Sequence, residues 1–268
     1  MNGEARSGKK SSEPEAPAYS APALEKGLDV LELLCGSDTP LSQKEIALKL
    51  GRSIGELYRM ITCLVDRGYI AIVDDRYIVT TKLFDLAHRN PPTHRLLAEA
   101  VPIMQRLSGE LDQSCHLTVY NEGRQIVMAK VDAPSGMGFS VRVGAELDVL
   151  VSSSGRVLLA FQDRETRTFR IEESLRRRPD HADPQIEARL ELVKARGFES
   201  SPSVQVRGLY AVSYPILDSQ GRALASLTVP YAERIDLAHR KPVHAVEDIL
   251  GVAARSLTAR LGSTTRAG

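Results

Sequence analysis

The sequence has few cysteines and lacks any long apolar run. Its three cysteines, Cys35, Cys63 and Cys115, are odd in number and include no Cys-x-x-Cys pair. Each stands among apolar neighbours, so we expect buried, reduced thiols in a cytoplasmic protein. No apolar run approaches the roughly 20 residues that a membrane helix needs, which excludes a membrane-spanning protein.

The sequence also carries almost no net charge. The formal net charge is +1, and residues 1–82 hold eleven Lys and Arg against twelve Asp and Glu. A basic patch is the usual electrostatic mark of a protein that binds nucleic acid. Because bulk charge gives no such mark here, any case for DNA binding must rest on local pattern.

Common catalytic and metal-binding motifs are missing as well. There is no Gly-x-Ser-x-Gly, no Walker A loop, no Gly-x-Gly-x-x-Gly and no His-Glu-x-x-His. The histidines do not cluster: His239 and His244 would lie on different helix faces, and His116 stands alone in a predicted strand. We therefore expect no metal, no cofactor and no enzyme activity.

The chain is long enough for two domains. Its 268 residues, 43% of them hydrophobic and 26% charged, fit a globular protein with one domain of ordinary size and one smaller domain. Residues 1–22 carry charges, Ser, Pro and Ala without a continuous apolar core. They predict a disordered tail and not a secretory signal.

Residues 23–82 carry three helical patterns followed by a hairpin pattern. In the first helix, Leu24, Leu28, Leu31 and Leu34 recur at helical spacing and predict one apolar face. The second and third helices each begin with a capping box, the first of Ser42 with Glu45 and the second of Ser53 with Glu56, and the turn Gly51-Arg52 joins them. Two β-favouring runs follow, 69–73 and 76–80, divided by Asp74-Asp75.

This order of elements is that of a winged helix-turn-helix, which places its third helix in the major groove of DNA. Side chains at the start of that helix are candidates for base contacts, and neighbouring polar groups and the wing are candidates for phosphate contacts. A three-helix protein-interaction domain is the alternative. The candidate DNA-binding residues are Ser42, Gln43, Arg52, Ser53, Ile54, Glu56, Tyr58, Arg59 and Arg76.

Residues 83–112 predict linker helices, and residues 113–265 predict a mixed α/β domain, so the fold class is α+β. Pro102 should start or kink a helix, which is expected of a linker more than of a core element. The later elements predicted are a hairpin of 115–120 and 125–131, a strand at 137–143, a helix at 156–161, a helix capped by Asp183-Pro184 and ended by Gly197, a hairpin of 204–217 and 222–231, and a closing helix from Pro242.

Several segments resemble the IclR family of bacterial regulators, in the right order and over nearly the whole chain after the tail. They are Ala23 to Leu31, Gly51 to Tyr69 with its Tyr58-Arg59 and Arg67-Gly68-Tyr69, Ser154 to Ala160, Arg196-Gly197-Phe198, and Gly208 to Ile216.

The resemblance implies an N-terminal winged helix, a linker helix that dimerises, and a GAF-like effector-binding domain that often mediates tetramers. It also implies control of a catabolic operon, as repressor or activator. One departure concerns the recognition helix, where the family commonly has a small Ser-Thr pair and this chain has Gly55-Glu56. A carboxylate there repels phosphate but can accept a hydrogen bond from cytosine N4, which leaves the preferred DNA sequence open.

The turn from Ser152 to Gly155 opens a helix, and its unpaired N–H groups and the helix dipole suit a carboxylate. From the residues alone, an ordinary N-cap of a core helix is the alternative. In the resembled family, this turn and the preceding loop line the effector pocket. The resemblance therefore places the acid group of an effector at Ser153, Ser154 and Gly155, with Leu147 and Val149 beside it.

Three further pocket positions of the family fall on Ser201, Ala211 and Thr228, where this chain has smaller or less polar side chains. The pocket should then be roomier and attract anions less, which favours an aromatic or otherwise bulky organic acid over a two- or three-carbon acid. Val119, Met128 and Phe139 would supply an apolar wall or serve as plain core.

We therefore expect a regulator that represses a catabolic operon and whose affinity for DNA is controlled by a small organic acid. Its partners would be a double-stranded operator and further copies of itself, as a homodimer or homotetramer. Two alternatives remain: a winged-helix protein-interaction module without a ligand, and a small-molecule hydrolase using Ser152, Ser153 or Ser154 with His116.

Overall fold

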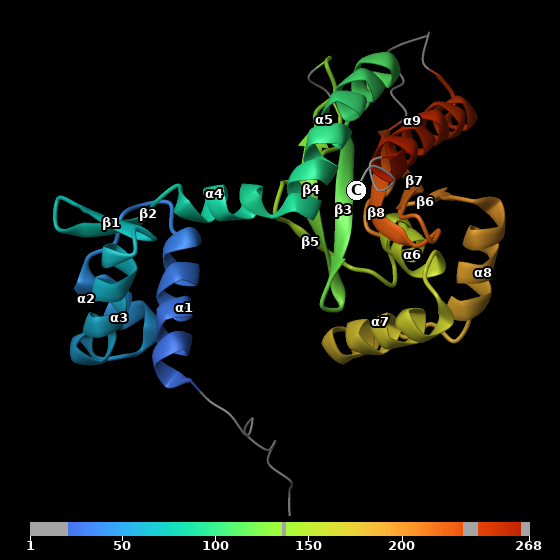
Figure 1. Cartoon of the computed structure of the whole chain (residues 1–268). Coiled ribbons are helices and arrows are strands. Elements are labelled where there is room, and N and C mark those ends of the chain that lie inside the picture. The colour runs from blue at the N-terminus through green and yellow to red at the C-terminus, as the bar shows by residue number, and fades with distance from the viewer. Residues whose placement is uncertain (1–20, 136–137, 233–240, 264–268) are drawn as a thin grey trace, which may run out of the picture. The chain divides into compact units, whose positions relative to one another are not determined.

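The computed structural model describes residues 21–135, 138–232 and 241–263. The chain divides into two compact units, Met1–Arg89 and Asn90–Gly268 (Figure 1). The predicted tail, residues 1–22, lies outside the described residues except for its last two. Of these, Pro22 already begins a helix, because its fixed φ suits the first helical position.

The first unit is the winged helix-turn-helix that the sequence predicts. Three helices are followed by a two-stranded antiparallel wing and a short fourth helix (Figure 1). The elements are α1 (Pro22–Cys35), α2 (Gln43–Leu50), α3 (Ile54–Asp66), β1 (Ile70–Val73), β2 (Arg76–Val79) and α4 (Lys82–Arg89).

Local polar chemistry fixes the ends of α2 and α3. The Glu45 carboxylate accepts from the Ser42 backbone N–H at 2.7 Å, and the Glu56 carboxylate accepts from the Ser53 backbone N–H at 2.9 Å. Each serine hydroxyl accepts in return from its glutamate's backbone N–H, so both predicted capping boxes are confirmed. Gly51, with φ +63°, ends α2 in the left-handed region that glycine adopts without strain.

The apolar face predicted for α1 is only half correct. Val30 and Leu34 are buried, but Leu24 is 63% exposed and Leu28 is 47% exposed. The helix packs against α2, α3 and β2 with the face that holds Val30 and Leu34, and the two N-terminal leucines fall outside that contact. The core of this unit is Val30, Leu34, Leu41, Ile46, Ala47, Leu57, Ile61 and Ile70.

The cysteines also depart from expectation. Cys35 on α1 and Cys63 on α3 are exposed, and only Cys115 is buried. Burial raises the pKa of the Cys115 thiol to about 12. The prediction of buried thiols at Cys35 and Cys63 was wrong, because apolar sequence neighbours on an amphipathic helix say little about which face a given position occupies.

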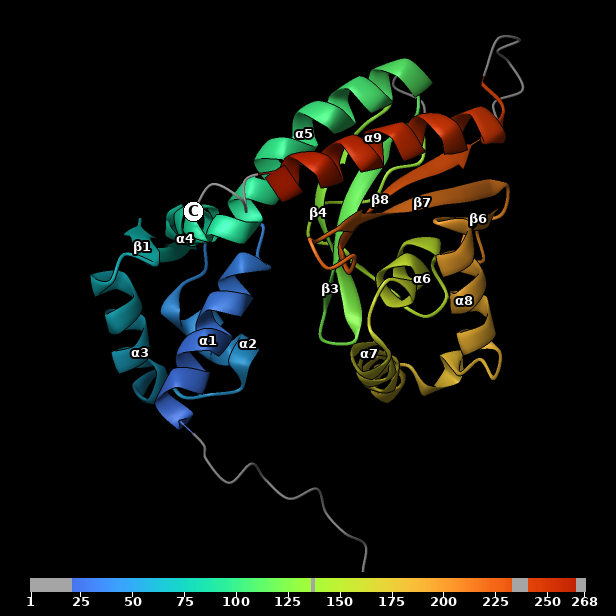
Figure 2. The ribbon, with the colours of Figure 1, turned by 45° about the vertical axis from the view of Figure 1, so that its right-hand side comes forward.

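The second unit is built on a six-stranded antiparallel sheet of order β5-β4-β3-β8-β7-β6. Helices α5 and α9 cover one face, and α6 covers the other with α7 and α8 packed beyond it (Figure 2). The elements are α5 (Pro91–Leu111), β3 (Cys115–Asn121), β4 (Arg124–Val131), β5 (Glu146–Leu147), α6 (Ser153–Ala160), α7 (Arg164–Arg177), α8 (Ile186–Arg196), β6 (Glu199–Pro202), β7 (Leu209–Leu217), β8 (Ala223–Ala232) and α9 (Val243–Ser263).

Helix α5 is a core element and not a free linker. Its residues Ala100, Met104 and Leu107 are buried against the sheet and α9, and Pro102 is exposed inside an unbroken helix. The proline removes one backbone N–H, but the packing of the buried face on both sides of it offsets that cost. The interpretation of Pro102 as a linker feature was therefore wrong.

Three other predicted elements needed correction. Residues 138–143 form no strand, and Met137 lies outside the described residues; the outer edge of β4 pairs instead with β5. Helix α8 begins at Ile186 without a side-chain cap, because the Asp183 carboxylate accepts from Gln185 N–H in a turn before it. The last hairpin begins only at Leu209. Strand β6 and helix α7 were not predicted, since neither shows a clear apolar period.

A close backbone approach seats α6 under the sheet. A Cβ atom added at Gly155 would lie 2.1 Å from the Val149 carbonyl oxygen, so only glycine permits this packing. Val149 is fully buried, and Val157, Leu159 and Ala160 of α6 share its core cluster. The position of the α6 N-terminus therefore depends on this one glycine.

Replacing Gly155 with alanine should lower the free energy of unfolding by about 2 kcal/mol or more, because the new methyl forces backbone to move. Gly109 provides the matched control: it is exposed in α5 and its added Cβ would meet nothing within 4 Å. Gly109→Ala should be neutral or stabilise by up to about 1 kcal/mol. Urea unfolding followed by circular dichroism measures both, and equal effects of the two variants would contradict the predicted steric constraint.

Candidate functional site: effector cavity and DNA-binding surface

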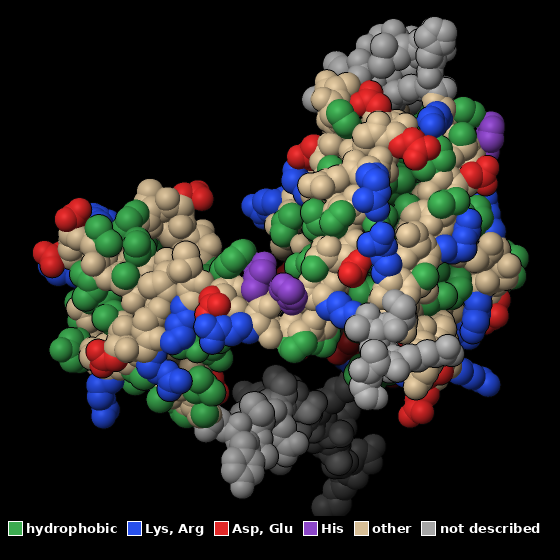
Figure 3. All heavy atoms as spheres, turned by 45° about the horizontal axis from the view of Figure 1, so that its top comes forward, with side chains coloured by type: hydrophobic (Ala, Val, Ile, Leu, Met, Phe, Trp, Pro, Cys, Tyr) green, Lys and Arg blue, Asp and Glu red, His purple; other side chains and the backbone are tan. Residues whose placement is uncertain are grey.

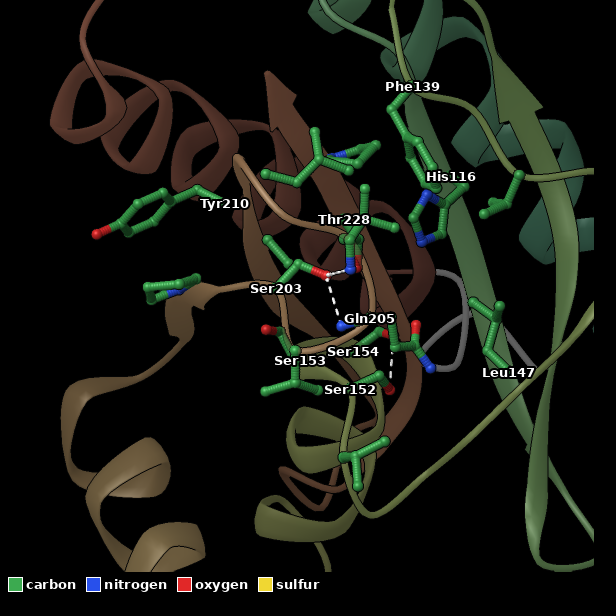
Figure 4. A pocket seen from close by; sticks show the side chains of 18 residues that line it. His116, Phe139, Leu147, Ser152, Ser153, Ser154, Ser203, Gln205, Tyr210 and Thr228 are labelled. Carbon is green, nitrogen blue, oxygen red and sulfur yellow. Dashed lines mark hydrogen bonds between the residues drawn. The ribbon is translucent and has the colours of Figure 1, made fainter. Parts of the chain in front are cut away.

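A cavity of about 140 Å³ lies in the second unit, between the sheet and the N-terminus of α6 (Figure 4). Strands β3, β7 and β8 form its floor, and residues 202–206 and the segment between β4 and α6 form its sides. The residues that line it are His116, Phe139, Val141, Leu147, Val151, Ser152, Ser153, Ser154, Pro202, Ser203, Val204, Gln205, Val206, Leu209, Tyr210, Ala211, Thr228 and Pro230.

The floor of the cavity is polar because of strand alternation. Side chains of successive residues in a strand point to opposite faces, so Cys115, Leu117 and their partners face α5 and α9 while His116 faces α6. His116 stands opposite Thr228 in the register of β3 and β8. The Thr228 hydroxyl shares a hydrogen bond of 2.9 Å with the Ser213 hydroxyl.

His116 is the most strongly perturbed side chain of the cavity. It is only 5% exposed, and burial lowers the pKa of its imidazole from 6.5 to about 4. The ring is therefore neutral near pH 7, with one N–H donor and one acceptor nitrogen. Among the described residues that line the cavity, Tyr210 is the other titratable one, and none is Lys, Arg, Asp or Glu.

The N-terminus of α6 supplies the positive end of the cavity. The Ser152 hydroxyl caps the helix by accepting from Gly155 N–H at 3.1 Å. The backbone N–H groups of Ser153 and Ser154 belong to the first turn, where no intrahelical acceptor exists. Both serines are at most 5% exposed and line the cavity. Such a helix start favours a carboxylate.

The predicted effector residues divide into two groups. Leu147, Ser153, Ser154, Ala211 and Thr228 line the cavity. The other three lie behind its wall: Val149 is fully buried under Gly155, and the Ser201 hydroxyl is shielded by hydrogen bonds to Ser153 Oγ at 3.1 Å and from Arg156 at 3.2 Å.

Arg156 holds Ser201 and the start of α6 in place behind the cavity wall. Its guanidinium donates to the Val151 carbonyl at 2.8 Å and to the Glu199 carboxylate at 3.0 Å, and both ionic side chains are at most 14% exposed. This half-buried pair holds its geometry because loss of either partner leaves a poorly solvated charge. Arg156 thereby ties α6 to β6.

Of the three residues expected to form an apolar wall or plain core, one is wall, and Val119 packs against the main core. Phe139 lines the cavity, whereas Val119 and Met128 line a separate groove near Leu224 at the other side of the sheet. His116 was noted only as an isolated histidine and as a conceivable catalytic partner. The alternation of polar His116 and Thr118 with apolar neighbours in one strand was the feature that could have placed it on a polar floor.

In the first unit, three of the predicted DNA-binding residues lie on α3 with exposed side chains. Ile54 is 41% exposed, Tyr58 is 59% exposed, and Arg59 is exposed. In the part of the chain that the structure describes, Arg59 has no ion-pair partner. On the face shown in Figure 3, basic and acidic side chains are interspersed over both units.

Several other predicted DNA contacts are engaged within the protein. Glu56 binds Ser53 and Lys26, and these hydrogen bonds lower the pKa of its carboxyl to about 2. Arg52 pairs with Asp29 at 3.0 Å. These groups therefore shape the surface of α3, and each would have to exchange a protein partner to contact DNA.

The wing and the start of α2 show the same behaviour. Arg76 binds the Glu45 carboxylate at 3.0 Å and the Pro40 carbonyl at 2.9 Å. The Ser42 hydroxyl donates to Glu45, and the amide nitrogen of Gln43 is shielded from solvent without a partner among the described residues. The Gln43 side-chain donor is therefore not exposed for the phosphate contact that the sequence predicts.

Family models match both units. The IclR helix-turn-helix domain model matches residues 23–72, and the model of the bacterial transcriptional regulator IclR C-terminal domain matches residues 92–258. The chain belongs to the IclR family. It is therefore a DNA-binding transcription regulator of that family, with the α+β architecture that the sequence predicts.

Individual relatives agree with this membership. The chain is 24% identical over 243 residues to the transcriptional regulator KdgR of Dickeya chrysanthemi, covering 88% of this chain and 79% of the relative. It is 26% identical over 213 residues to the Pca regulon regulatory protein of Pseudomonas putida, covering 77% and 73%. The crystal structure of an IclR homolog from Microbacterium hydrocarbonoxydans superposes with a TM-score of 0.74 at 23% identity, covering 89% of this chain and 98% of that one.

The hydrolase alternative finds little support in this IclR-family chain. The curated relatives are transcription regulators. Among the described residues, His116 forms no hydrogen bond with the serines of the α6 turn, whose hydroxyls bind Gln125, Asp148 and Ser201 instead. The described residues also include no group of three or more His, Cys, Asp or Glu that could hold a metal ion, and no helix among them is long and apolar enough to span a membrane.

The lowered pKa of His116 predicts how stability depends on pH. Below pH 6.5 the unfolded chain binds a proton at His116, but the folded chain does so only near pH 4. The contribution of neutral His116 to the free energy of unfolding is therefore fully present above pH 6.5 and is lost as pH falls toward 4. Lys130, the cross-strand neighbour of His116, is already paired with Asp132.

We expect the stability of the wild type, relative to His116→Gln, to fall by about 2 kcal/mol between about pH 7.5 and about pH 5, at ~1.4 kcal/mol per pH unit below 6.5. Glutamine does not titrate, so subtracting its curve removes the contribution of other groups. Urea unfolding at several pH values measures the difference. Parallel stability curves for the two proteins would show that His116 is not held neutral by burial.

Proposed function

We propose that this IclR-family regulator represses a catabolic operon and that a small aromatic acid, bound in the cavity beside α6, controls its affinity for operator DNA. The observation that carries the proposal is the composition of the cavity. A helix N-terminus suits the acid group, and apolar side chains such as Phe139 and Leu147 suit a ring. Among the described residues that line the cavity, no cationic side chain would hold a small anion such as pyruvate by charge alone.

The size of the cavity supports a single aromatic ring. An apolar cavity of about 150 Å³ accommodates benzene, and the cavity here measures about 140 Å³. The homolog from Microbacterium hydrocarbonoxydans was crystallised in complex with 4-hydroxybenzoate. A ligand with one aromatic ring and one acid group is consistent with the volume and lining found here.

For the DNA-binding end, we propose that α3 enters the major groove and that the wing contacts the flanking backbone. Tyr58 and Ile54 would reach base edges, and Arg59 would contact phosphate. A palindromic operator mirrors a twofold protein, so the binding unit would be a homodimer or a homotetramer built from it.

A mobility-shift assay on the chain's own upstream intergenic DNA tests the proposal. At fixed salt the protein should shift this DNA specifically, and benzoate or 4-hydroxybenzoate should change the apparent Kd by at least about 5-fold, a typical allosteric coupling. Pyruvate and glyoxylate should have no such effect. A response to pyruvate or glyoxylate alone would contradict the aromatic effector, and no shift at low salt would favour a protein-interaction module.

The role of Arg59 can be tested by the salt dependence of DNA binding. Each phosphate contact releases counterions, so Arg59→Ala should weaken binding for all sequences and lower the slope of log K against log salt by about 1 per bound subunit. Arg164 is the matched control, because it is exposed at the start of α7 in the other unit. Arg164→Ala should leave the slope unchanged; an unchanged slope for Arg59→Ala would remove Arg59 from the phosphate contacts.

A further inference from the structure

His116 is a cavity residue whose polar atoms the fold leaves without a partner. Its side chain is almost wholly buried and lines the cavity near Phe139 and Thr228 (Figure 4). The residues that the structure describes form no hydrogen bond to its ring, whose nitrogens keep access to the cavity. The hydroxyl of Thr228, its cross-strand neighbour, is already bound to Ser213.

A ligand that fills the cavity displaces the solvent next to this neutral imidazole, and its nitrogens are then costly to bury unless the ligand supplies new hydrogen bonds. The imidazole presents one donor and one acceptor, which match the donor and acceptor of a hydroxyl group. The opening that His116 faces is the cavity itself. A ligand group in that cavity is therefore the natural partner for the ring.

The group that meets His116 should be uncharged. A carboxylate there would favour the imidazolium form, and that form requires a charge in a site where burial already lowers the pKa of His116 to about 4. The free backbone N–H groups of Ser153 and Ser154 offer an anion a better position. The two ends of the ligand are thus expected to differ in chemistry.

We propose that His116 determines effector specificity by hydrogen bonding to an uncharged hydroxyl group on the ring of the effector, while the acid group of the effector binds at the start of α6. The ligand class is therefore a hydroxylated aromatic acid and not a plain one. This inference rests on the proposed function, because it assigns a role within the same cavity.

Isothermal titration calorimetry of the full chain with benzoate, 3-hydroxybenzoate and 4-hydroxybenzoate at about pH 7.5 tests the inference. At least one hydroxybenzoate should bind between about 5-fold and about 150-fold more tightly than benzoate, the range expected when a buried polar group gains or lacks its partner. The ratio of the two Kd values is the quantity of interest, since a purely structural role of His116 would change both affinities together.

Two variants of His116 and one control sharpen the test. His116→Phe keeps a ring but removes both nitrogens, and should bring the ratio to about 1 with benzoate binding retained. His116→Gln keeps an uncharged donor and acceptor, and should preserve part of the preference. Thr118→Val is the matched control, because the buried Thr118 hydroxyl on the same face of β3 also lacks a partner but does not line the cavity. In Thr118→Val, the ratio of the benzoate Kd to the hydroxybenzoate Kd should equal that of the wild type.

The outcomes separate this inference from the proposed function. Equal affinity for all three benzoates in the wild type, or a preference that persists in His116→Phe, overturns the role of His116 and leaves an aromatic acid effector standing. No binding of any benzoate overturns the aromatic effector and this inference together. If circular dichroism shows that His116→Phe does not fold, His116→Gln takes its place. A preference for hydroxybenzoate that is weaker in His116→Gln than in Thr118→Val supports the role of His116, and an equal preference in the two variants overturns it.

Discussion

The cavity proposed to bind the effector depends on the contact between the Gly155 backbone and the Val149 carbonyl. That contact lets the first turn of α6 lie directly beneath the segment that leads out of β5, where any side chain at position 155 would collide with backbone. The helix start is thereby held against the sheet, and Ser153 and Ser154 of its first turn line the cavity. The half-buried pair of Arg156 and Glu199 then ties the same helix to the edge strand β6.

The sheet is the second constraint, because it separates two environments. The face toward α5 and α9 carries the main hydrophobic core of the unit. The face toward α6 carries His116, Thr118, Ser213 and Thr228, all buried. Polar groups in such a position are costly unless they are satisfied. Ser213 and Thr228 bind each other, whereas His116 lines the cavity without a hydrogen-bond partner among the described residues.

In the first unit, by contrast, several exposed charged side chains form ion pairs with one another. Glu45, Glu56, Arg52 and Arg76 all have partners within the unit. These pairs are exposed and individually weak, so DNA phosphates can compete for the arginines. The balance also explains how a DNA-binding unit can carry no excess of positive charge in its sequence.

The sequence by itself determined the parts of this protein that local chemistry controls. Capping boxes at Ser42 and Ser53, the positive-φ glycine at Gly51 and the polar turn before α6 are short-range features, and each appears where the pattern predicts it. The tertiary structure alone decided which face of α1 is buried, that α5 is core despite Pro102, and that Val149, Gly155 and Ser201 stand behind the cavity wall while His116 and Phe139 face it. The physical reason is that burial and cavity lining depend on contacts between residues far apart in the chain, and no local period records which partner a side chain will meet.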